Sequence, residues 1–516
     1  MANPSIQLGT NSNWAVKEDK LLAYKEYNDY FFNKEFDFSR GTSATYVAKD
    51  GLIKTAGIQP NIVTNGDFAT DSDWTKGSGW SISGGKASND GSVSGNDYLI
   101  NSASTSIVGQ TYKVVFTVSD YVQGNLRVRS GQASSTYINA NGTYTQYQVS
   151  TSTETVRVQA INNFIGSIDN ISVQEIQTDT PRIDFTNDTK GHLLLEPSRT
   201  NLVTQSQNTT IGYTHFNFSG GSLIDSYGYK SPDGTNNASR LVYTNSSAGS
   251  GGSLLTQNIT INATGTYTIS LWAKSISGIK QIRISPKNSG SQGTSGEVFT
   301  ITNEWKKYSH TFTNDGATNR GFQFRILESD SSGDRTFDVW GMQLEEGDYA
   351  TSTIPTTGAT STRNADVCNN SGSAQDFNSE EGVLYAEIAA LADDLTSRVI
   401  SISDGSINER VQMAYQNVSN RIKAFIIGGG TSTSLIANLT DITDFVKVAI
   451  KYKSGDYALW VDGIEVQTKT TAFTPTGLSS LQFDSGSGSN DFKGKVRNVQ
   501  VFTEALTDAE LQELTS

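Results

Sequence analysis

Residues 180–204, TPRIDFTNDTKGHLLLEPSRTNLVT, decide how the rest of the chain is divided. The apolar run at residues 192–195 lies between turn residues, which indicates a short buried strand. Pro197 then prevents a helix and fits poorly in a central strand. Residues 201–204 (NLVT) nearly repeat residues 61–64 (NIVT). We therefore interpret this stretch as a junction, where upstream segments pair and a second module begins.

Composition and charge narrow the class of protein. The 516 residues suggest three or four domains. The 48 glycines and the short apolar runs indicate all-β sandwiches with many turns. The net charge of −13 argues against nucleic acid as a partner, because phosphate binding needs concentrated Lys and Arg. Cys368 is the single cysteine, so no disulfide can form within the chain.

Two stretches of the chain share the same strand pattern. Residues 265–273 match residues 109–118, and residues 338–344 match residues 169–174, at similar offsets. Similar strands in the same order predict a divergent internal repeat. Asp50-Gly51, between alternating segments, predicts a β-hairpin upstream of the repeat.

These patterns divide the chain into five parts. We expect, in order, a docking arm and hairpin collar (1–60, pairing with 180–200), module A (61–178), junction strands with module B (179–348), a linker (349–370) and module C (371–516).

Several phrases along the chain resemble a segment common in bacteriophage tail-fibre and appendage proteins. They are residues 36–53 (FDFSRGTSATYVAKDGLI), 181–203, 341–345 (GMQLE), 349–352 (YATS) and 363–366 (RNAD). In that family the first two phrases follow each other closely, so module A looks like an insertion here. The resemblance implies a virion protein that folds in the host cytoplasm and is exposed on the particle surface. It also implies other virion proteins as partners and a homo-oligomer; trimers are common among such fibres, but no pattern fixes the number.

The modules carry resemblances of their own. NGDF (65–68) and DNISV (169–173) are similar to the opening and closing phrases of jelly-roll carbohydrate-binding modules. Residues 491–502 and 506–511 resemble laminin-G and concanavalin-like lectin domains, with Thr507 as the N-cap of a terminal helix. The implied fold is all-β and multidomain: two jelly-roll sandwiches, a concanavalin/laminin-G-like sandwich and a small N-terminal docking region.

The sequence offers no convincing catalytic site. His192, His215 and His310 are scattered, and no phosphate loop, zinc spacing or nucleophile elbow is present. Adjacent carboxylates such as Glu380-Glu381 point to opposite faces of a strand, which suits paired acid–base work poorly. We predict a protein that is not an enzyme, with a glycosidase built on distant carboxylates as the open alternative.

Aromatic side chains in or near predicted loops suit glycan binding. Sugars stack their C–H faces on aromatic rings and offer hydroxyls to planar polar side chains. The candidates are Trp74, Trp80 and Tyr98 in module A and Tyr227, Tyr229 and Trp305 in module B. The alternative is core packing, which we expect for Trp272 and Trp340 because both lie inside alternating strands.

Calcium is the one cofactor that the resemblance implies. Jelly-roll modules of this kind often hold a structural Ca²⁺ between the opening and last strands. The matching residues are Asp67 and Asp169 in module A and Asp338 in module B. Ca²⁺ takes six or more oxygen ligands. The opening phrase of module B lacks the matching aspartate. The alternative to a calcium site is that Asp169 and Asp338 are turn residues.

The first 30 residues are rich in aromatic and charged side chains. Docking to another virion subunit would use Trp14, Tyr24, Tyr27, Tyr30 and Phe31. Aromatic anchors of this kind dominate interface energies. Packing on a neighbouring domain of the same chain is the alternative.

The main hypothesis is a bacteriophage virion structural protein, a tail or head fibre or appendage that attaches to host-surface glycan. One alternative is a purely structural or decoration protein whose lectin-like folds contact other subunits. Another is a bacterial polysaccharide-binding accessory protein or depolymerase. The N-terminus has no apolar signal core and no run is long enough to span a bilayer, so no membrane span is expected.

Overall fold

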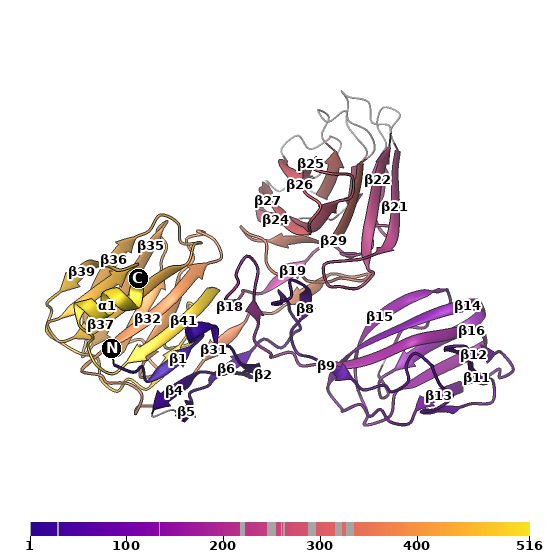
Figure 1. Cartoon of the computed structure of the whole chain (residues 1–516), viewed down its shortest axis with the longest axis horizontal. Helices are drawn as coiled ribbons and strands as arrows, with labels where there is room; N and C mark the ends of the chain where they lie inside the picture. The colour runs from indigo at the N-terminus through magenta and orange to yellow at the C-terminus, as the bar shows by residue number, and fades with distance from the viewer. Residues whose placement is uncertain are drawn as a thin grey trace. The chain divides into compact units, whose positions relative to one another are not determined.

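A computed structural model describes most of the chain as β-strands (Figure 1). It describes residues 2–27, 30–133, 135–216, 222–244, 254–257, 259, 261, 264–286, 296–314, 322–326 and 335–516. The chain forms two compact units: unit 1 is residues 1–55 with 179–516, and unit 2 is residues 56–178. The predicted all-β, multidomain fold is confirmed.

Unit 2 contains module A and is built around two long strands. Its strands are β9 (Ile58–Asn61), β10 (Trp74–Lys76), β11 (Trp80–Ser83), β12 (Lys86–Asp90), β13 (Asp97–Asn101), β14 (Thr111–Arg129), β15 (Gly142–Val149) and β16 (Arg157–Ile176). The first half of β14 pairs with β15 and the second half of β16, and the other halves pair with each other. Each long strand changes direction midway, at Gly124 and at Asn162-Asn163, where φ is positive. A Cβ at Gly124 would lie 2.4 Å from Phe164 Cα, so this corner requires glycine.

Module B has two five-stranded sheets. One has the order β21-β22-β29-β24-β27: β21 (Ser222–Tyr229), β22 (Ala238–Thr244), β29 (Arg335–Glu346), β24 (Gly265–Ser275) and β27 (Lys306–Asn314). The other has the order β20-β23-β28-β25-β26: β20 (Thr214–Phe216), β23 (Leu254–Gln257), β28 (Phe322–Ile326), β25 (Lys280–Pro286) and β26 (Glu297–Ile301). The strands of unit 2 pair in a similar order. Its long strand β14 takes the places of β24 and β25, and its long strand β16 takes the places of β29 and β28.

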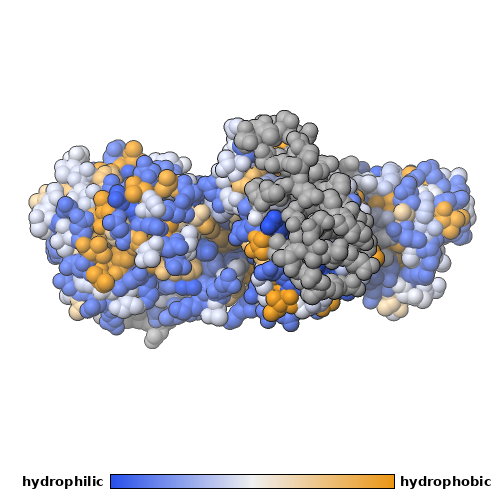
Figure 2. All heavy atoms as spheres, turned by 90° about the horizontal axis from the view of Figure 1, so that it is seen from above, coloured by the Kyte–Doolittle hydropathy of each residue, from blue (hydrophilic) through white to orange (hydrophobic). Residues whose placement is uncertain are grey.

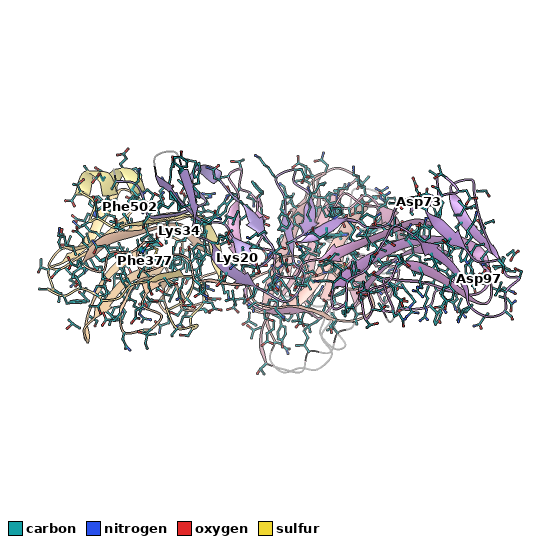
Figure 3. All side chains as sticks on the ribbon, turned by 90° about the horizontal axis from the view of Figure 1, so that it is seen from below. Lys20, Lys34, Asp73, Asp97, Phe377 and Phe502 are labelled. Atoms are coloured by element: carbon teal, nitrogen blue, oxygen red, sulfur yellow. The ribbon has the colours of Figure 1, made fainter. Side chains whose placement is uncertain are left out.

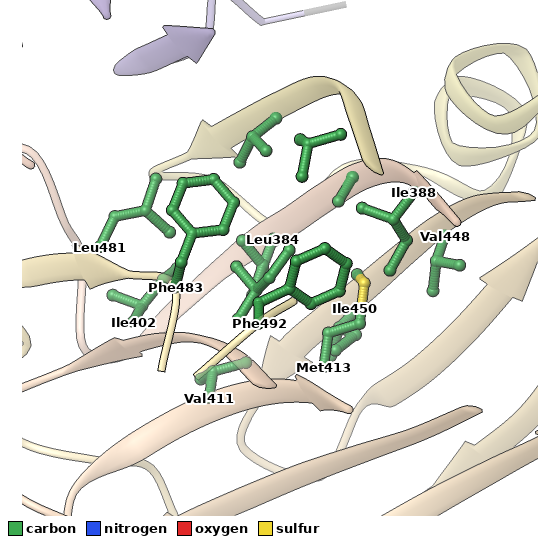
Figure 4. Close-up of a cluster of buried hydrophobic side chains, with 14 of the residues drawn as sticks. Leu384, Ile388, Ile402, Val411, Met413, Val448, Ile450, Leu481, Phe483 and Phe492 are labelled. Atoms are coloured by element: carbon green, nitrogen blue, oxygen red, sulfur yellow. The ribbon is translucent and has the colours of Figure 1, made fainter. Parts of the chain in front are cut away.

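Module C packs two sheets around the largest apolar core (Figure 4). One sheet runs β36-β35-β34-β33-β40: β36 (Thr431–Asn438), β35 (Arg421–Gly428), β34 (Arg410–Tyr415), β33 (Arg398–Ser403) and β40 (Ser480–Gln482). The other begins β39-β38-β37-β32-β41: β39 (Ile464–Lys469), β38 (Tyr457–Val461), β37 (Val446–Lys453), β32 (Glu381–Ala390) and β41 (Gly494–Phe502). Helix α1 (Asp508–Thr515) follows, and the predicted Thr507 cap is confirmed: its side chain accepts a hydrogen bond from the Glu510 N–H.

The N-terminal residues complete this second sheet. Beyond β41 it continues with β1 (Ile6–Leu8), β4 (Tyr24–Tyr27) and β5 (Tyr30–Asn33), and β18 (His192–Leu195) with β17 (Ile183–Asp184) also joins β41. Ile6 and Leu8 are fully buried in the module C core. Residues 1–60 were expected to form a separate arm and collar. Instead, β1 lies inside the sheet because its partner β41 comes from the other end of the chain.

Smaller strand pairs connect the junction to the rest of unit 1. They are the hairpin β7 (Thr45–Val47) with β8 (Ile53–Thr55), the pair β19 (Arg199–Asn201) with β30 (Ser361–Arg363), and the sheet β2 (Val16–Lys17), β3 (Lys20–Leu21), β6 (Phe36–Ser39) and β31 (Val367–Asn369). The predicted Asp50-Gly51 hairpin is confirmed. The junction contacts it where the Phe185 N–H donates to the Val47 carbonyl at 2.8 Å.

A buried ion cluster holds the junction together. Arg182 bonds Glu196 at 2.7 Å and Asp366 at 2.5 Å. Arg40 reaches Asp366 at 3.0 Å, and Arg363 reaches Glu196 at 2.8 Å. All five side chains are at most 3% exposed. They come from three separated stretches, residues 36–53, 181–203 and 363–366, which together supply one buried network.

The surface is mainly hydrophilic on the face drawn in Figure 2. Among the described residues, no helix is both long and apolar enough to cross a bilayer.

Candidate glycan-binding face

Trp74 and Trp80 lie in the core of unit 2. They are 6% and 5% exposed and belong to the same apolar cluster. The indole N–H of Trp74 donates to the Asn65 carbonyl at 2.9 Å, and its ring lies 5.2 Å from that of Phe68. Neither indole offers a free face on which a sugar could stack.

Tyr98 lies on the outward side of β13, in a row of polar side chains. Across the sheet Tyr98 stands opposite Gln159 of β16, which stands opposite Arg127 of β14. Gln159 is 3% exposed and forms the floor of the row. Its Oε1 accepts from Arg127 Nε at 2.7 Å, and its Nε2 donates to Asn96 Oδ1 at 2.6 Å.

A second row lies two residues along the same side of the sheet. Arg157 of β16 stands opposite Ile100 of β13 and Arg129 of β14. The residues between the two rows, such as Leu99 and Val128, are fully buried in the core. This alternation places Tyr98, Arg127, Arg129 and Arg157 on one side of the sheet.

Arginines and tyrosines contact each other across this surface. The Arg127 guanidinium lies 4.4 Å from the ring centre of Tyr137, which is 39% exposed. The Arg157 guanidinium lies 5.9 Å from the ring centre of Tyr98. We call the set the arginine face; it consists of Tyr98, Arg127, Arg129, Tyr137, Arg157 and Gln159.

The arginine face concentrates positive charge. Burial lowers the pKa of Arg129, and the charges of Arg127 and Arg157 lower it further. Glu154 pairs with Arg157. The Arg129 Nε donates to the Ala133 carbonyl at 3.3 Å. One carboxylate therefore accompanies three guanidinium groups, which leaves an excess of hydrogen-bond donors.

Asp97 fixes the loop beside the arginine face. It precedes Tyr98, is 5% exposed and is labelled in Figure 3. Its carboxylate accepts from the Gly79 N–H at 3.1 Å and from Asn89 Nδ2 at 2.9 Å. A Cβ at Gly77 would lie 1.8 Å from Asp97 Oδ1, so the loop can approach only as glycine.

The candidates in module B lie on a different sheet. Tyr227 is 44% exposed on β21. Tyr229 lies under the Arg240 guanidinium at 3.9 Å, and Trp305 under the Lys274 ammonium at 5.1 Å. Tyr229 and Trp305 also pack against an apolar cluster around Trp340, which is 2% exposed. These three aromatic residues therefore belong to module B of unit 1, whereas Tyr98 belongs to the sheet of unit 2.

The candidate calcium residues differ between the modules. In module A the opening and closing segments meet, because the Ile171 N–H donates to the Gly66 carbonyl at 2.8 Å. The Asp169 carboxylate accepts from the backbone and side chain of Asn170. In module B, Asp338 is 1% exposed and pairs with Arg240 at 2.7 Å and Lys274 at 3.5 Å. Two cations already neutralise Asp338, so its environment suits Ca²⁺ poorly.

Among the described residues, no three His, Cys, Asp or Glu side chains gather as a metal-binding group. Calcium in module A stays a prediction, with Asp67 and Asp169 as the carboxylates that would contribute.

The docking candidates fall into two groups. Tyr30 and Phe31 are 71% and 67% exposed on β5, at one edge of the large sheet. Tyr24 is half-buried and its ring lies 5.4 Å from that of Phe31. Trp14 packs on the module C core and its indole donates to the Lys190 carbonyl at 3.3 Å. The side chain of Tyr27 lies outside the described residues.

Unit 1 also contains a cavity of about 600 Å³ at the junction. Three of its lining groups bond to one another: Asp188 accepts from His192 and Arg497, each at 3.0 Å. Burial opposes ionisation of Asp188, but these two hydrogen bonds lower its pKa below the usual range. His215 and His310 lie elsewhere, next to Asp225 and Glu297. Asp188 and the three histidines thus each contact a charged neighbour within unit 1.

Arg127, Arg129, Tyr137, Arg157 and Gln159 were not predicted as site residues. The pattern that could have found them is in NLRVR (125–129) and VRVQ (156–159), where long polar side chains alternate with valine and leucine. Such alternation marks the outward side of each strand, but only the pairing of β14 with β16 brings the two together.

Two family models match parts of the chain. One, described as the concanavalin A-like lectin/glucanases superfamily, matches residues 373–512. The other, described as a carbohydrate binding domain, matches residues 207–333. A search of curated proteins gave no match.

Solved structures resemble the chain at low identity. Domain 4 of AbnA, an extracellular arabinanase from Geobacillus stearothermophilus, is 12% identical over 33% of this chain and 83% of its own, with a TM-score of 0.25. The CBM22 tandem of Paenibacillus barcinonensis Xyn10C is 11% identical over 57% and 99%, with a TM-score of 0.23. Trypanosoma rangeli sialidase is 10% identical over 96% and 91%, with a TM-score of 0.23. Likenesses of this size carry no argument about function. The family matches show that the chain carries a carbohydrate-binding domain and a concanavalin-like domain.

Proposed function

We propose that this protein binds glycans without cleaving them, and that the arginine face is one of its binding sites. The observation that carries the proposal is the juxtaposition of two tyrosine rings with planar polar side chains on one sheet surface. The matches to a carbohydrate-binding domain (207–333) and a concanavalin-like domain (373–512) support glycan binding by the protein as a whole, whereas the arginine face lies outside both matched ranges and rests on its own geometry.

The arginine face supplies the groups that a sugar needs. Tyr98 and Tyr137 offer ring faces for C–H groups, and their hydroxyls can bond to water or ligand. Gln159 and Asn96 hold Arg127 in place, so little side-chain entropy is lost when a hydroxyl binds. A site of this kind is preorganised for binding and places no acid–base pair at a glycosidic bond.

An array of polysaccharides probed with the full chain tests this proposal. Tyr98→Ala should weaken binding about tenfold, which corresponds to about 1.4 kcal/mol. Tyr147→Ala is the matched control, since Tyr147 is 50% exposed on β15, away from the arginine face. Equal loss in both variants, or binding unchanged by Tyr98→Ala, would remove the site. Release of reducing ends from any bound polysaccharide would show an enzyme instead.

The resemblance of residues 36–53 and 181–203 to phage appendage segments supports a wider role. We propose a virion appendage that carries these domains to the host surface and attaches to other subunits through β5. The exposed aromatics of β5 support this, because an edge strand with unpaired backbone groups can extend into another chain. A bacterial polysaccharide-binding protein would use the same domains. Immunogold labelling separates the two: label on phage particles favours the appendage, and label on bacterial surfaces alone favours the alternative.

A further inference from the structure

We propose that the arginine face binds an anionic saccharide, one whose sugars carry carboxylate or sulfate groups. This inference rests on the proposed glycan binding and specifies its ligand class.

The first argument is the placement of like charges. Arg129 and Arg157 stand directly opposite each other on neighbouring strands, with Arg127 two residues away on the same side. Like charges in opposite positions destabilise a sheet. Glu154 relieves part of this repulsion at Arg157. A bound anion between the guanidinium groups would relieve the rest, which turns an unfavourable arrangement into a binding site.

The second argument is that module B also has two arginines at facing positions on the equivalent pair of strands, two residues along from the facing pair of module A. In the sheet that corresponds to the arginine face, Arg283 of β25 stands directly opposite Arg325 of β28. IRI (282–284) occupies the place of LRV (126–128), so Arg283 corresponds to Arg127. Arg325 likewise corresponds to Gln159, so module B has an arginine in register where module A has a glutamine. The two modules therefore share arginines at facing register positions of this strand pair, although not at the same pair of positions.

The third argument is the contrast with the rest of the chain. The protein carries a net charge of −13, so a positive surface is not a consequence of general composition. An acidic protein repels polyanions at long range, and local donors must overcome that repulsion. Guanidinium groups suit the task because their fork geometry matches carboxylate and sulfate oxygens. Tyr98 and Tyr137 would then align the sugar ring beside the charged group.

Binding of the full chain to two matched pairs of polysaccharides tests the inference. The first pair is polygalacturonate and its carboxyl-reduced form; the second is dextran sulfate and dextran. We expect the charged member of at least one pair to bind at least about tenfold more tightly, with an affinity that falls as NaCl rises. The first pair reports carboxylate recognition and the second sulfate recognition.

Two double variants complete the test. Arg127→Gln with Arg129→Gln should abolish the preference for the charged member. Lys86→Gln with Lys113→Gln removes the same charge from β12 and from the first half of β14, outside the arginine face, and should leave the preference in place. An equal loss in both double variants would mean a general charge effect and would overturn the inference. Thermal melting checks that each variant is folded, and Arg127→Lys provides a milder change that keeps the charge.

The outcomes also separate this inference from the proposed function. Binding to neutral polysaccharides with no preference for charge would overturn the anionic ligand but leave glycan binding in place. If the chain binds neither these four polymers nor any member of the broader array, both ideas fail.

Discussion

At the scale of single residues, the ion cluster at the junction is the most sensitive part of unit 1. Glu196 accepts hydrogen bonds from Arg182, from the Ser352 N–H and from the Ser352 hydroxyl, each at 2.7 Å. Burial alone would raise the pKa of Glu196, but attraction to Arg363 and Arg182 lowers it below its usual range. Removing one member leaves buried charges without partners, which is why such clusters tolerate few substitutions.

Glu196→Gln should lower the free energy of unfolding of unit 1 by about 3–5 kcal/mol. Glu380→Gln is the control, because Glu380 is exposed. Denaturant titration with tryptophan fluorescence measures the difference. If the two variants unfold at the same midpoint as the wild type, the cluster does not stabilise the junction.

The same residue predicts a pH dependence. A carboxyl whose pKa is lower in the folded protein stabilises it above the unfolded value, about 4.3 for Glu, and loses that contribution as the pH falls through and below this value. The wild type should therefore lose more stability between pH 7 and pH 4 than Glu196→Gln does. Parallel denaturant titrations at the two pH values measure this, and identical losses would contradict it.

At the scale of elements, the two edges of the large sheet differ in their exposed side chains. β5 exposes the aromatic residues Tyr30, Phe31 and Phe32 by 71%, 67% and 51%, whereas β39 at the other edge exposes the aliphatic residues Ile464 and Val466. Deleting residues 1–30 would also remove Ile6 and Leu8 from the core. Point substitution on β5 is therefore the cleaner test of docking.

Phe31→Lys should reduce self-association or incorporation into particles, because a charge on an edge strand opposes strand addition. Ile464→Lys makes the same change on the opposite edge and should have little effect. Sedimentation velocity of the full chain reports self-association. A wild type that stays monomeric and enters particles as readily as Phe31→Lys would exclude β5 as the docking element.

Some elements could be predicted from sequence and others could not. Strict alternation identified the strands of module A, because one side of each is buried. Trp80 was predicted as a glycan contact because it is aromatic, but it is buried. Trp80 and Ile82 alternate with the exposed Ser81 and Ser83, and this alternation indicates that both apolar side chains point inward. Tyr98 could be proposed, but its neighbours Arg127 and Arg157 depend on pairing between distant strands. The N-terminal strands could not be placed, because β1 pairs with β41 at the other end of the chain.

At the scale of the whole molecule, unit 2 has the form of an insertion. Its first and last strands pair, and the Gln177 N–H donates to the Gly57 carbonyl at 3.0 Å. The two ends of unit 2 therefore meet, which lets it leave and re-enter unit 1 at one place. The insertion of a module between two phrases that are otherwise adjacent stays a prediction, and a comparison with related chains would test it.

Unit 2 has its own apolar core, so replacing residues 56–178 with a short glycine-serine linker should leave unit 1 folded. The full chain should melt in two transitions, and the deletion variant should lose one of them. Calorimetry of both proteins measures this. A deletion variant without any cooperative transition would show that the units depend on each other for folding.

Hydrogen–deuterium exchange of the full chain, with and without a polysaccharide that it binds, tests glycan binding by the arginine face most directly. The predicted result is protection in β13, at residues 125–129 of β14 and at residues 157–161 of β16. Protection confined to the junction cavity of unit 1, with these segments unchanged, would contradict it.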